Sequence, residues 1–295
     1  MLSLEFLRDL AGKHSGALGA RVREFELKGR VVSSNSRKSI MGVINLSPDS
    51  WYRESVCLSA DAAIRRAFVL QEQGAAVVDI GAESTLAHAA RLDEGLQHSK
   101  LLPVLEGLKT LRIPISVETY NLAVARRCLE AGARIINLTG TEETAEFYRL
   151  ARDFDAAVIV CFVQGRNVRE VGDLGLEGDA VEVMHGYFAG EVERAENAGL
   201  RKLFIDPGLG FYYRNLQDSA VRVRHQMKVF LNTFRLRALG YPVCHALPHA
   251  FEFFGEEVRS AEPFFAVLAA LGNTDLFRTH EVPKVKAVLD AMSVF

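Results

Sequence analysis

The sequence predicts an α/β protein of the (β/α)8 TIM-barrel class, preceded by a short N-terminal extension. Short apolar runs bounded by turn residues, which are typical of buried parallel strands, alternate with longer amphipathic segments. The alternation occurs eight times within about 250 residues, the size of such a barrel. Polar residues follow nearly all of the runs, whereas a doubly wound open sheet would collect them at one switch point. The absence of G-x-G-x-x-G and G-x-x-x-x-G-K-[ST] phosphate loops also disfavours the open sheet.

The first predicted strand sets the pattern for the others. It is an apolar run that ends abruptly at Asn45 and is followed by a turn. The predicted strands are residues 40–44, 76–80, 114–117, 134–136, 156–163, 203–205, 242–247 and 275–277. Because barrel enzymes place their chemistry at the carboxyl ends of the strands, the polar residues after each run are candidate site residues.

Helices are predicted between the strands from apolar faces and capping residues. Ser59 can cap the first helix and Gly74 can end it. Asp179 with Glu182 resembles a capping box, and Pro283 stands where proline favours the start of a helix. The predicted helices are residues 59–74, 96–108, 121–132, 142–153, 179–198, 219–239 and 261–271, and a last helix that Pro283 opens.

Two segments fall outside this alternation. Residues 1–38 are interpreted as an N-terminal extension, with an amphipathic helix at 2–10 and a strand or hairpin arm at 25–33. We expect the extension to form a lid across one end of the main domain, residues 39–295. Residues 164–178 contain several glycines and mixed charges, and are interpreted as a mobile loop.

Composition limits the function classes. Hydrophobic residues make up 49% and charged residues 24% of the chain, as in a globular protein with a large core. The 35 Lys and Arg residues against 37 Asp and Glu residues give a net charge of −2, which argues against a nucleic-acid partner but permits a local anion pocket. A basic cluster on one predicted helix is interpreted as a solvated face; it comprises Arg222, Arg224, His225, Lys228, Arg235 and Arg237.

The cysteines and the apolar runs give no sign of secretion or membrane insertion. The four cysteines lie far apart without a C-x-x-C pair, which favours buried free thiols over disulfides or a zinc site. The longest apolar run, residues 263–272, is far shorter than the roughly 20 residues that span a bilayer. The amino terminus is charged where a signal peptide would be apolar. We therefore expect a soluble, cytoplasmic protein.

Polar groups from all parts of the chain would converge at one barrel mouth. They are Asn45, Glu83, Ser84, Thr85, Glu118, Asn137, Gln164, Asp206, His245, His249, Arg278 and His280. For any single Asn or Asp, a turn or helix cap is an alternative interpretation. For Arg278 the alternative is a structural salt bridge. The histidines lack the helical or C-x-x-C-type spacing of zinc ligands.

Two kinds of chemistry are present in this set. Glu118, Asn137 and Asp206 supply the carboxylates and the amide that could read a flat, nitrogen-rich heterocycle. Arg278 and His280 are two residues apart on an extended segment and would point the same way. With Asn45, they could hold an oxyanion or phosphate that a divalent cation shares.

These residues occur in motifs that resemble those of dihydropteroate synthases. Residues 41–50 (MGVINLSPDS) resemble the first signature of the family, and residues 79–85 (DIGAEST) resemble the second. Segments 115–120, 135–137, 206–211 and 278–280 follow in the family's order, so the resemblance covers roughly residues 38 to 292. Six motifs in register are specific for the pterin-binding barrel superfamily.

The resemblance implies an activity and a role for each matching residue. The family condenses 6-hydroxymethyl-7,8-dihydropterin pyrophosphate with 4-aminobenzoate, releases pyrophosphate, and forms homodimers through late helices. By resemblance, Asn45 would bind Mg²⁺, and Arg278, His280 and Asn45 would bind the pyrophosphate. The pterin would be bound by Thr85, Glu118, Asn137 and Asp206, with further loop contacts from Asp49, Ser84 and His249.

The chain departs from the family pattern at several of these places. Family members carry aspartate where this chain has Glu118, so the carboxylate reaches about one methylene further. Their Ser-Arg-Lys after the seventh strand falls near residues 247–251, where His249 is the candidate replacement for the pterin-contacting lysine. Leu86-Ala87 replaces the family's Arg-Pro, and Trp51 to Glu54 replaces a small, glycine-rich loop.

Three functions are therefore considered. The first is a dihydropteroate synthase-like transferase of folate or pterin biosynthesis that uses 4-aminobenzoate or a related aryl amine. The second is a non-catalytic pterin-binding homologue, which the missing lysine and the changed loops favour. The third is a methyltransferase that moves a methyl group from a reduced pterin to a corrinoid. That class has no pyrophosphate to bind, so Arg278 and His280 count against it.

Overall fold

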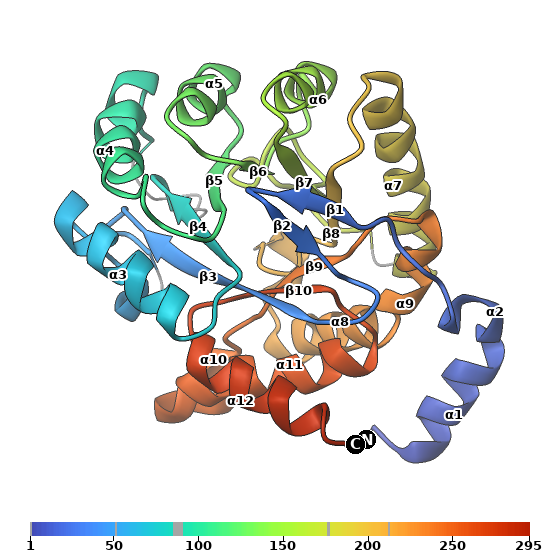
Figure 1. Cartoon of the computed structure of the whole chain (residues 1–295). Helices are drawn as coiled ribbons and strands as arrows, with labels where there is room; N and C mark the ends of the chain where they lie inside the picture. Colours follow the sequence, from blue (N-terminus) through green and yellow to red (C-terminus); the bar gives the residue numbers. More distant parts are fainter. Residues whose placement is uncertain (1, 51, 85–90, 176–177, 212) are drawn as a thin grey trace.

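The computed structural model describes residues 2–50, 52–84, 91–175, 178–211 and 213–295. Eight parallel strands form a barrel that is ringed by helices (Figure 1). The predicted (β/α)8 fold is therefore confirmed. The strands follow the order β8-β7-β6-β5-β4-β3-β10-β9. They are β3 (Ser39–Asn45), β4 (Val77–Gly81), β5 (Ile115–Thr119), β6 (Ile135–Leu138), β7 (Ala157–Cys161), β8 (Leu203–Asp206), β9 (Cys244–Ala246) and β10 (Leu276–Thr279).

The seam between β8 and β9 closes the barrel. A parallel bridge joins Ile205 to Val243, and the Ile205 N–H donates to the carbonyl of Pro242 at 3.0 Å. The Oδ2 atom of Asp275 accepts the Val243 N–H at 2.8 Å, and Arg237 forms a buried ion pair with Asp275.

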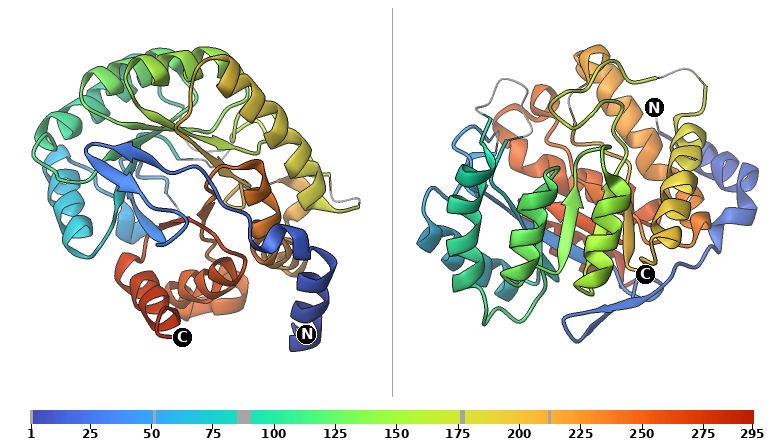
Figure 2. Two further views of the ribbon diagram at one scale, coloured as in Figure 1. Left: turned by 45° about the vertical axis from the view of Figure 1, so that its right-hand side comes forward. Right: turned by 90° about the horizontal axis from the view of Figure 1, so that it is seen from above.

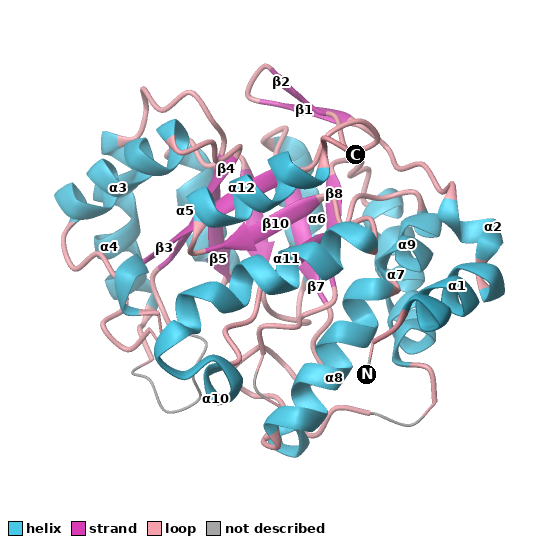
Figure 3. Cartoon of the chain, turned by 90° about the horizontal axis from the view of Figure 1, so that it is seen from below, coloured by secondary structure: helices cyan, strands magenta, loops and turns pink. Residues whose placement is uncertain are grey.

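Helices form the outer layer of the molecule (Figure 3). The longer ones are α3 (Ala60–Glu72), α4 (Glu94–Gly107), α5 (Leu122–Glu130), α6 (Thr144–Asp153), α7 (Ala180–Asn197), α8 (Ser219–Leu231), α11 (Ala261–Leu271) and α12 (Val282–Met292). Short segments are η1 (Arg53–Ser55), η2 (Arg214–Leu216), α9 (Thr233–Leu236), η3 (Arg237–Leu239), α10 (Phe251–Phe254) and η4 (Gly255–Ser260).

Local sequence explains where most of these helices begin. The side chains of Ser59, Asn121 and Asp179 accept backbone N–H groups in the first turns of α3, α5 and α7, as predicted. The predicted helix 219–239 is wrong in detail, because it is divided into α8, α9 and η3. At the break, the hydroxyl of Thr233 donates back to the carbonyl of Phe230 at 2.8 Å, a local bond that competes with helix continuation.

The N-terminal extension contains α1 (Leu4–Lys13), α2 (Ser15–Leu18) and an antiparallel hairpin of β1 (Phe25–Leu27) and β2 (Arg30–Val32). The hairpin lies across one end of the barrel (Figure 2). There Leu27 is buried, and the ring of Phe25 meets that of Phe204 edge to face at 5.2 Å. Their neighbours come from the amino-terminal parts of the strands, so the hairpin covers the end opposite the candidate site. Helix α1 buries no residue.

The described residues of the segment 164–178 form β-bridges and a side-chain hydrogen bond. Isolated antiparallel bridges join Gly165 to Val171 and Gly140 to Asn167. The Oε1 atom of Gln164 accepts the N–H of Gly175 at 2.7 Å, so this side chain fastens the loop.

None of the described helices is both long and apolar enough to cross a membrane.

Replacing Gly272 by alanine is expected to lower the free energy of unfolding by about 1–3 kcal/mol. The added Cβ would lie 1.7 Å from the carbonyl oxygen of Phe230, which is backbone at the end of α8 and cannot rotate away. Urea unfolding measures the change. In the control Gly186→Ala, nothing lies within 4 Å of the added Cβ, and this position inside α7 should gain about 0.5–1 kcal/mol. Equal effects of the two substitutions would contradict this explanation.

Candidate active site

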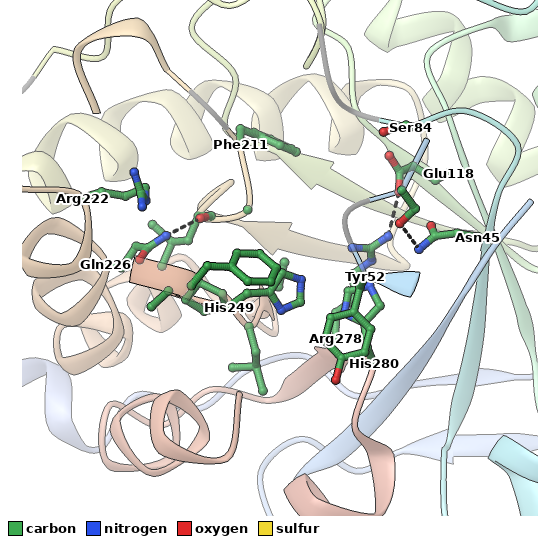
Figure 4. A pocket seen from close by; sticks show the side chains of 18 of the residues that line it. Asn45, Tyr52, Ser84, Glu118, Phe211, Arg222, Gln226, His249, Arg278 and His280 are labelled. Atoms are coloured by element: carbon green, nitrogen blue, oxygen red, sulfur yellow. Dashed lines mark hydrogen bonds and ion pairs between the residues drawn. The ribbon is translucent and has the colours of Figure 1, made fainter. Parts of the chain in front are cut away.

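A cavity opens at the carboxyl ends of the barrel strands (Figure 4). Predicted site residues from both halves of the chain line it. As the two-residue spacing predicted, Arg278 and His280 both face this cavity. Its polar lining includes Asn45, Glu83, Ser84, Glu118, His249, Arg278 and His280, and the side of the cavity away from Arg278 includes Phe211, Arg222, Gln226 and Glu252 (Figure 4).

The guanidinium of Arg278 bridges two carboxylates on the cavity floor. Its Nε donates to Asp79 Oδ2 at 2.8 Å, and its Nη2 donates to Glu118 Oε2 at 2.7 Å. Asp79 has no exposed surface, and the side chain of Glu118 keeps 11% exposure. The structure thus ties β10 to β4 and β5 through one side chain. Arg278 is a structural salt-bridge residue and a cavity residue at once.

Asn137 and Asp206 lie just below this floor. Asn137 donates to the same Asp79 Oδ2 at 3.1 Å and accepts from the thiol of Cys161 at 3.6 Å. Asp206 accepts the backbone N–H of Gly208 at 2.8 Å. Both side chains are buried, and neither is part of the cavity lining. Their predicted contact with a pterin therefore stays a prediction.

Two carboxyl groups at or just below the floor have raised pKa values. Burial raises the pKa of Glu118 to about 7 although Arg278 opposes the shift, and burial raises the pKa of Asp206 to about 6 against the N–H of Gly208. Burial alone would lower the pKa of Arg278, but Asp79 and Glu118 raise it above its ordinary value. The floor and the layer just below it therefore hold three carboxyl groups, those of Asp79, Glu118 and Asp206, and one permanent cation, Arg278.

Asn45 presents its amide oxygen to the cavity. Its Nδ2 donates to Ser50 at 2.8 Å and to Ser55 at 2.7 Å, which fixes the orientation of the amide. Asn45 Oδ1 and Glu118 Oε2 flank Gly81, where a Cβ would lie 3.9 Å and 3.7 Å from these atoms. Amide and carboxylate oxygens are the donors that Mg²⁺ prefers. The residues present therefore fit the Mg²⁺ ion that the resemblance implies.

The loops beside Asn45 place other predicted residues. Ser84 lines the cavity, and its hydroxyl donates to the backbone carbonyl of Asp49 at 3.4 Å. The side chain of Asp49 is exposed and does not line the cavity. Thr85 lies outside the described residues, as do Trp51 and the pair Leu86-Ala87.

Glu83 has a mainly structural role. It accepts the Leu92 N–H at 2.5 Å and the Tyr120 hydroxyl at 3.0 Å, and it lies 3.3 Å from Arg169 Nη1. These contacts join three loops around the mouth.

Three aromatic rings form one wall of the cavity. Tyr52 stacks on His249 with ring centroids 4.8 Å apart and on His280 at 4.6 Å, and its hydroxyl donates to Glu281. Behind the rings lies Glu262, fully buried, with Oε1 at 2.7 Å from His280 Nδ1 and 3.6 Å from His249 Nδ1. Sequence reasoning missed Tyr52 and Glu262 as site residues.

His249 is a neutral ring at physiological pH. Burial, helped by His280, lowers the pKa of His249 to about 4. Burial would raise the pKa of Glu262, but His280 and the hydrogen bonds it receives hold that pKa below its ordinary value. An imidazole without charge thus stands where the resemblance expects a lysine ammonium.

The far wall of the cavity contains Arg222. Its Nη2 donates to Glu252 Oε1 at 2.6 Å, and its Nη1 donates to the carbonyl of Leu216 at 2.9 Å. Gln226 beside it donates to the carbonyl of Leu209 at 2.9 Å. Phe211 lies across from these groups and supplies apolar surface (Figure 4).

Several sequence predictions about this region are wrong. His245 is fully buried outside the barrel, where its Nε2 lies 2.8 Å from the Thr233 hydroxyl. The basic cluster is not one solvated face, because Arg222 and Arg237 are buried and Arg235 pairs with Asp179 at 2.7 Å.

Sequence reasoning also missed Asp79 as a site residue. Its signal was visible in the sequence as one carboxylate inside an otherwise apolar strand.

Comparison with known proteins shows which family model and which relatives this chain matches. The model of the family described as pterin binding enzyme matches residues 41–248. The dihydropteroate synthase of Bacillus subtilis is 29% identical over 284 residues, covering 90% of this chain and 92% of that protein. The dihydropteroate synthase of Synechocystis sp. is 28% identical over 258 residues, covering 83% and 86%.

A solved structure agrees with this placement. The dihydropteroate synthase of Xanthomonas albilineans, in complex with indole-2-carboxylic acid and 6-chloroguanine, is 26% identical and superposes with a TM-score of 0.74. The match covers 93% of this chain and 97% of that one. With more than half of its length matched by the family model, and with its barrel and cavity at the expected strand ends, this chain belongs to the pterin binding enzyme family.

Proposed function

We propose that this protein is a dihydropteroate synthase that condenses 6-hydroxymethyl-7,8-dihydropterin pyrophosphate with 4-aminobenzoate or a related aryl amine. The observation that carries the proposal is the joining of Asn45, Glu118 and Arg278 in one cavity at the strand ends. Its floor pairs a guanidinium with carboxylates that have room to accept hydrogen bonds. Relatives named dihydropteroate synthase match most of the chain and support this assignment.

The floor suits the recognition of a pterin. A pterin ring presents an amino-amidine edge whose donors can be accepted by a carboxylate, much as a guanidinium is. Glu118 lies at the cavity surface, with Asp206 and Asn137 beneath it. The longer side chain of Glu118 brings its carboxylate up to Arg278, so the acceptor is held in place before the ligand arrives.

The leaving diphosphate needs positive charge and hydrogen-bond donors. Arg278 and His280 lie on the same side of the cavity, and Asn45 holds its amide oxygen toward it. Mg²⁺, when bound by Asn45, would neutralise negative charge on the leaving group. Arg278 already shares its charge with Asp79 and Glu118, so a cation bound by Asn45 would supply a large part of the positive charge at the leaving group.

The far wall of the cavity suits an aryl amine with an acidic group. Phe211 supplies an apolar surface, and Arg222 supplies a guanidinium whose carboxylate partner, Glu252, is half exposed. By resemblance to the family, we also propose a homodimer built on the late helices and a soluble, cytoplasmic protein.

A non-catalytic pterin-binding role is the second candidate. The observation that favours it is the neutral His249 at the place where a lysine is expected. Methyl transfer from a reduced pterin is disfavoured, because Arg278 and His280 both remain in the cavity.

Two measurements separate these functions. The first is calorimetric titration with the dihydropterin pyrophosphate and Mg²⁺, and the second is an assay of pyrophosphate release with 4-aminobenzoate. The proposed activity requires both saturable binding and release. Binding without release would establish the non-catalytic role. Absence of binding would overturn both.

Arg278→Ala should abolish ligand binding and lower the stability of the fold, because Asp79 and Glu118 would be left as buried, unpaired carboxyl groups. Arg278→Lys should fold, yet lose pyrophosphate release by about 100-fold or more, because an ammonium cannot bridge two carboxylates as a planar guanidinium does. Steady-state release rates and thermal melting measure these effects.

The control for this prediction is Arg235→Ala. Arg235 pairs with Asp179, the residue that caps α7, and is not part of the cavity lining, so release should remain near the wild-type rate. Normal activity of Arg278→Lys would exclude the proposed role of the guanidinium.

Pterin affinity should fall as pH decreases from 8 to 6. Burial raises the pKa of Glu118 to about 7 and that of Asp206 to about 6, so these carboxyl groups gain protons in this range and lose acceptor capacity. Titration of 6-hydroxymethylpterin, which carries no diphosphate, measures this without interference from the leaving group. In Glu118→Gln the inflection near pH 7 should disappear, and a wild-type-like profile in that variant would rule Glu118 out as its source.

A further inference from the structure

Two histidines and a glutamate converge beside the proposed diphosphate region. One ring nitrogen of His249, one ring nitrogen of His280 and a carboxylate oxygen of Glu262 all lie within 4.8 Å of one another. Within the described chain, this is the one group of at least three histidine, cysteine or acidic residues close enough to hold a metal ion. This group is separate from the implied Mg²⁺ site, where the ligating atom of Asn45 would be its amide oxygen.

Glu262 is oriented so that one of its oxygens serves this cluster. Its Oε2 accepts the Thr279 hydroxyl, the His280 N–H at 3.0 Å and the Glu281 N–H at 3.1 Å. Oε1 is turned toward the two imidazoles, at 2.7 Å from His280 Nδ1 and 3.6 Å from His249 Nδ1. Hydrogen bonds of this kind position the ligating atoms in protein metal sites.

His249 provides an independent observation that points to a ligand at this place. Its Nδ1 atom is buried and has no hydrogen-bond partner among the described residues, although it faces a carboxylate. Buried polar atoms are almost always satisfied, and one left without a partner costs free energy. A cation between the imidazoles and Oε1 would satisfy this nitrogen.

Tyr52 fixes the two imidazole rings. It stacks on His249 with an interplanar angle of 24° and on His280 at 29°, and its hydroxyl is held by Glu281. Both ring nitrogens are thereby held toward Glu262. A preformed arrangement of ligands loses little side-chain entropy when a metal binds.

We propose that His249, Glu262 and His280 bind a divalent transition-metal ion, with Zn²⁺ as the best match. Two imidazoles and one carboxylate are a common ligand set of catalytic zinc sites, which keep a further position open. Ligands at 2.0–2.1 Å from a tetrahedral ion lie about 3.3 Å apart. The 3.6 Å distance from His249 Nδ1 to Glu262 Oε1 already suits this spacing. The 2.7 Å distance from His280 Nδ1 to the same oxygen has to lengthen slightly.

The open position of this ion would face the cavity. His249 and His280 both line the cavity, whereas Glu262 lies behind them. The ion would therefore present a Lewis acid to an anionic oxygen of a molecule in the cavity. Metal binding itself does not depend on the proposed synthase activity, so the two can fail separately.

The test uses the full-length protein after removal of metals with EDTA. Titration with ZnCl₂ by calorimetry should show one equivalent of saturable binding, and CoCl₂ should give the visible absorption of a tetrahedral site. Excess MgCl₂ should leave both unchanged, because Mg²⁺ prefers oxygen ligands. His249→Lys should weaken Zn²⁺ binding by at least about 100-fold, because a charged ammonium offers no lone pair.

A matched variant and a folding measurement complete the test. His98→Ala removes a histidine that lies 3.9 Å from Glu94 outside the cluster, and should retain wild-type Zn²⁺ affinity. ZnCl₂ should raise the melting temperature of the wild type and of His98→Ala but not of His249→Lys. If His249→Lys fails to fold, His249→Gln provides the same comparison. Equal binding by wild type and His249 variants, or displacement of Zn²⁺ by Mg²⁺, would overturn the proposal.

Discussion

The guanidinium of Arg278 is the interaction on which the candidate site depends. It reaches from the last barrel strand to Asp79 and Glu118 on two strands from the first half of the chain. Breaking a buried ion pair leaves an uncompensated charge, which is strongly destabilising. Because Asn137 also donates to Asp79, four strands meet in one polar network. The structure can only hold this network if the barrel is closed in the correct register, so fold and site are specified together.

Much of the barrel could be predicted because its signals are local. Apolar runs, capping residues such as Ser59 and Asn121, and polar strand ends are all read within a few residues. The direction of a side chain at the end of a strand is harder, because a shift of one residue moves it to the other face. His245 was misplaced for this reason: its neighbour Ala246 faces the cavity, whereas His245 packs against Thr233 and Phe230.

The unpredicted parts depend on partners that are distant in the sequence. The partners of the arginines near residues 222–237 come from other segments, such as Glu252 for Arg222 and Asp275 for Arg237. No periodicity along one helix could reveal them. Glu262 likewise precedes His280 by 18 residues, and only the packing of α11 beside β10 brings them together. Family motifs identified the cavity and the departure at His249, but they could not reveal that His249 and His280 both lie beside Glu262.

His249, the candidate replacement for the family's lysine, is better understood together with Glu262. A lysine ammonium would supply a permanent positive charge, whereas the imidazole of His249 is neutral. The nearby carboxylate of Glu262 then adds negative charge beside a cavity in which Arg278 is already paired with the two carboxylates of Asp79 and Glu118. An anionic substrate would meet a poor electrostatic environment there unless cations were added. A metal ion held by His249, Glu262 and His280 restores the missing charge on the same wall, and makes it dependent on metal supply. The departure from lysine therefore changes the source of positive charge in the cavity, while the framework that positions the ligands is kept.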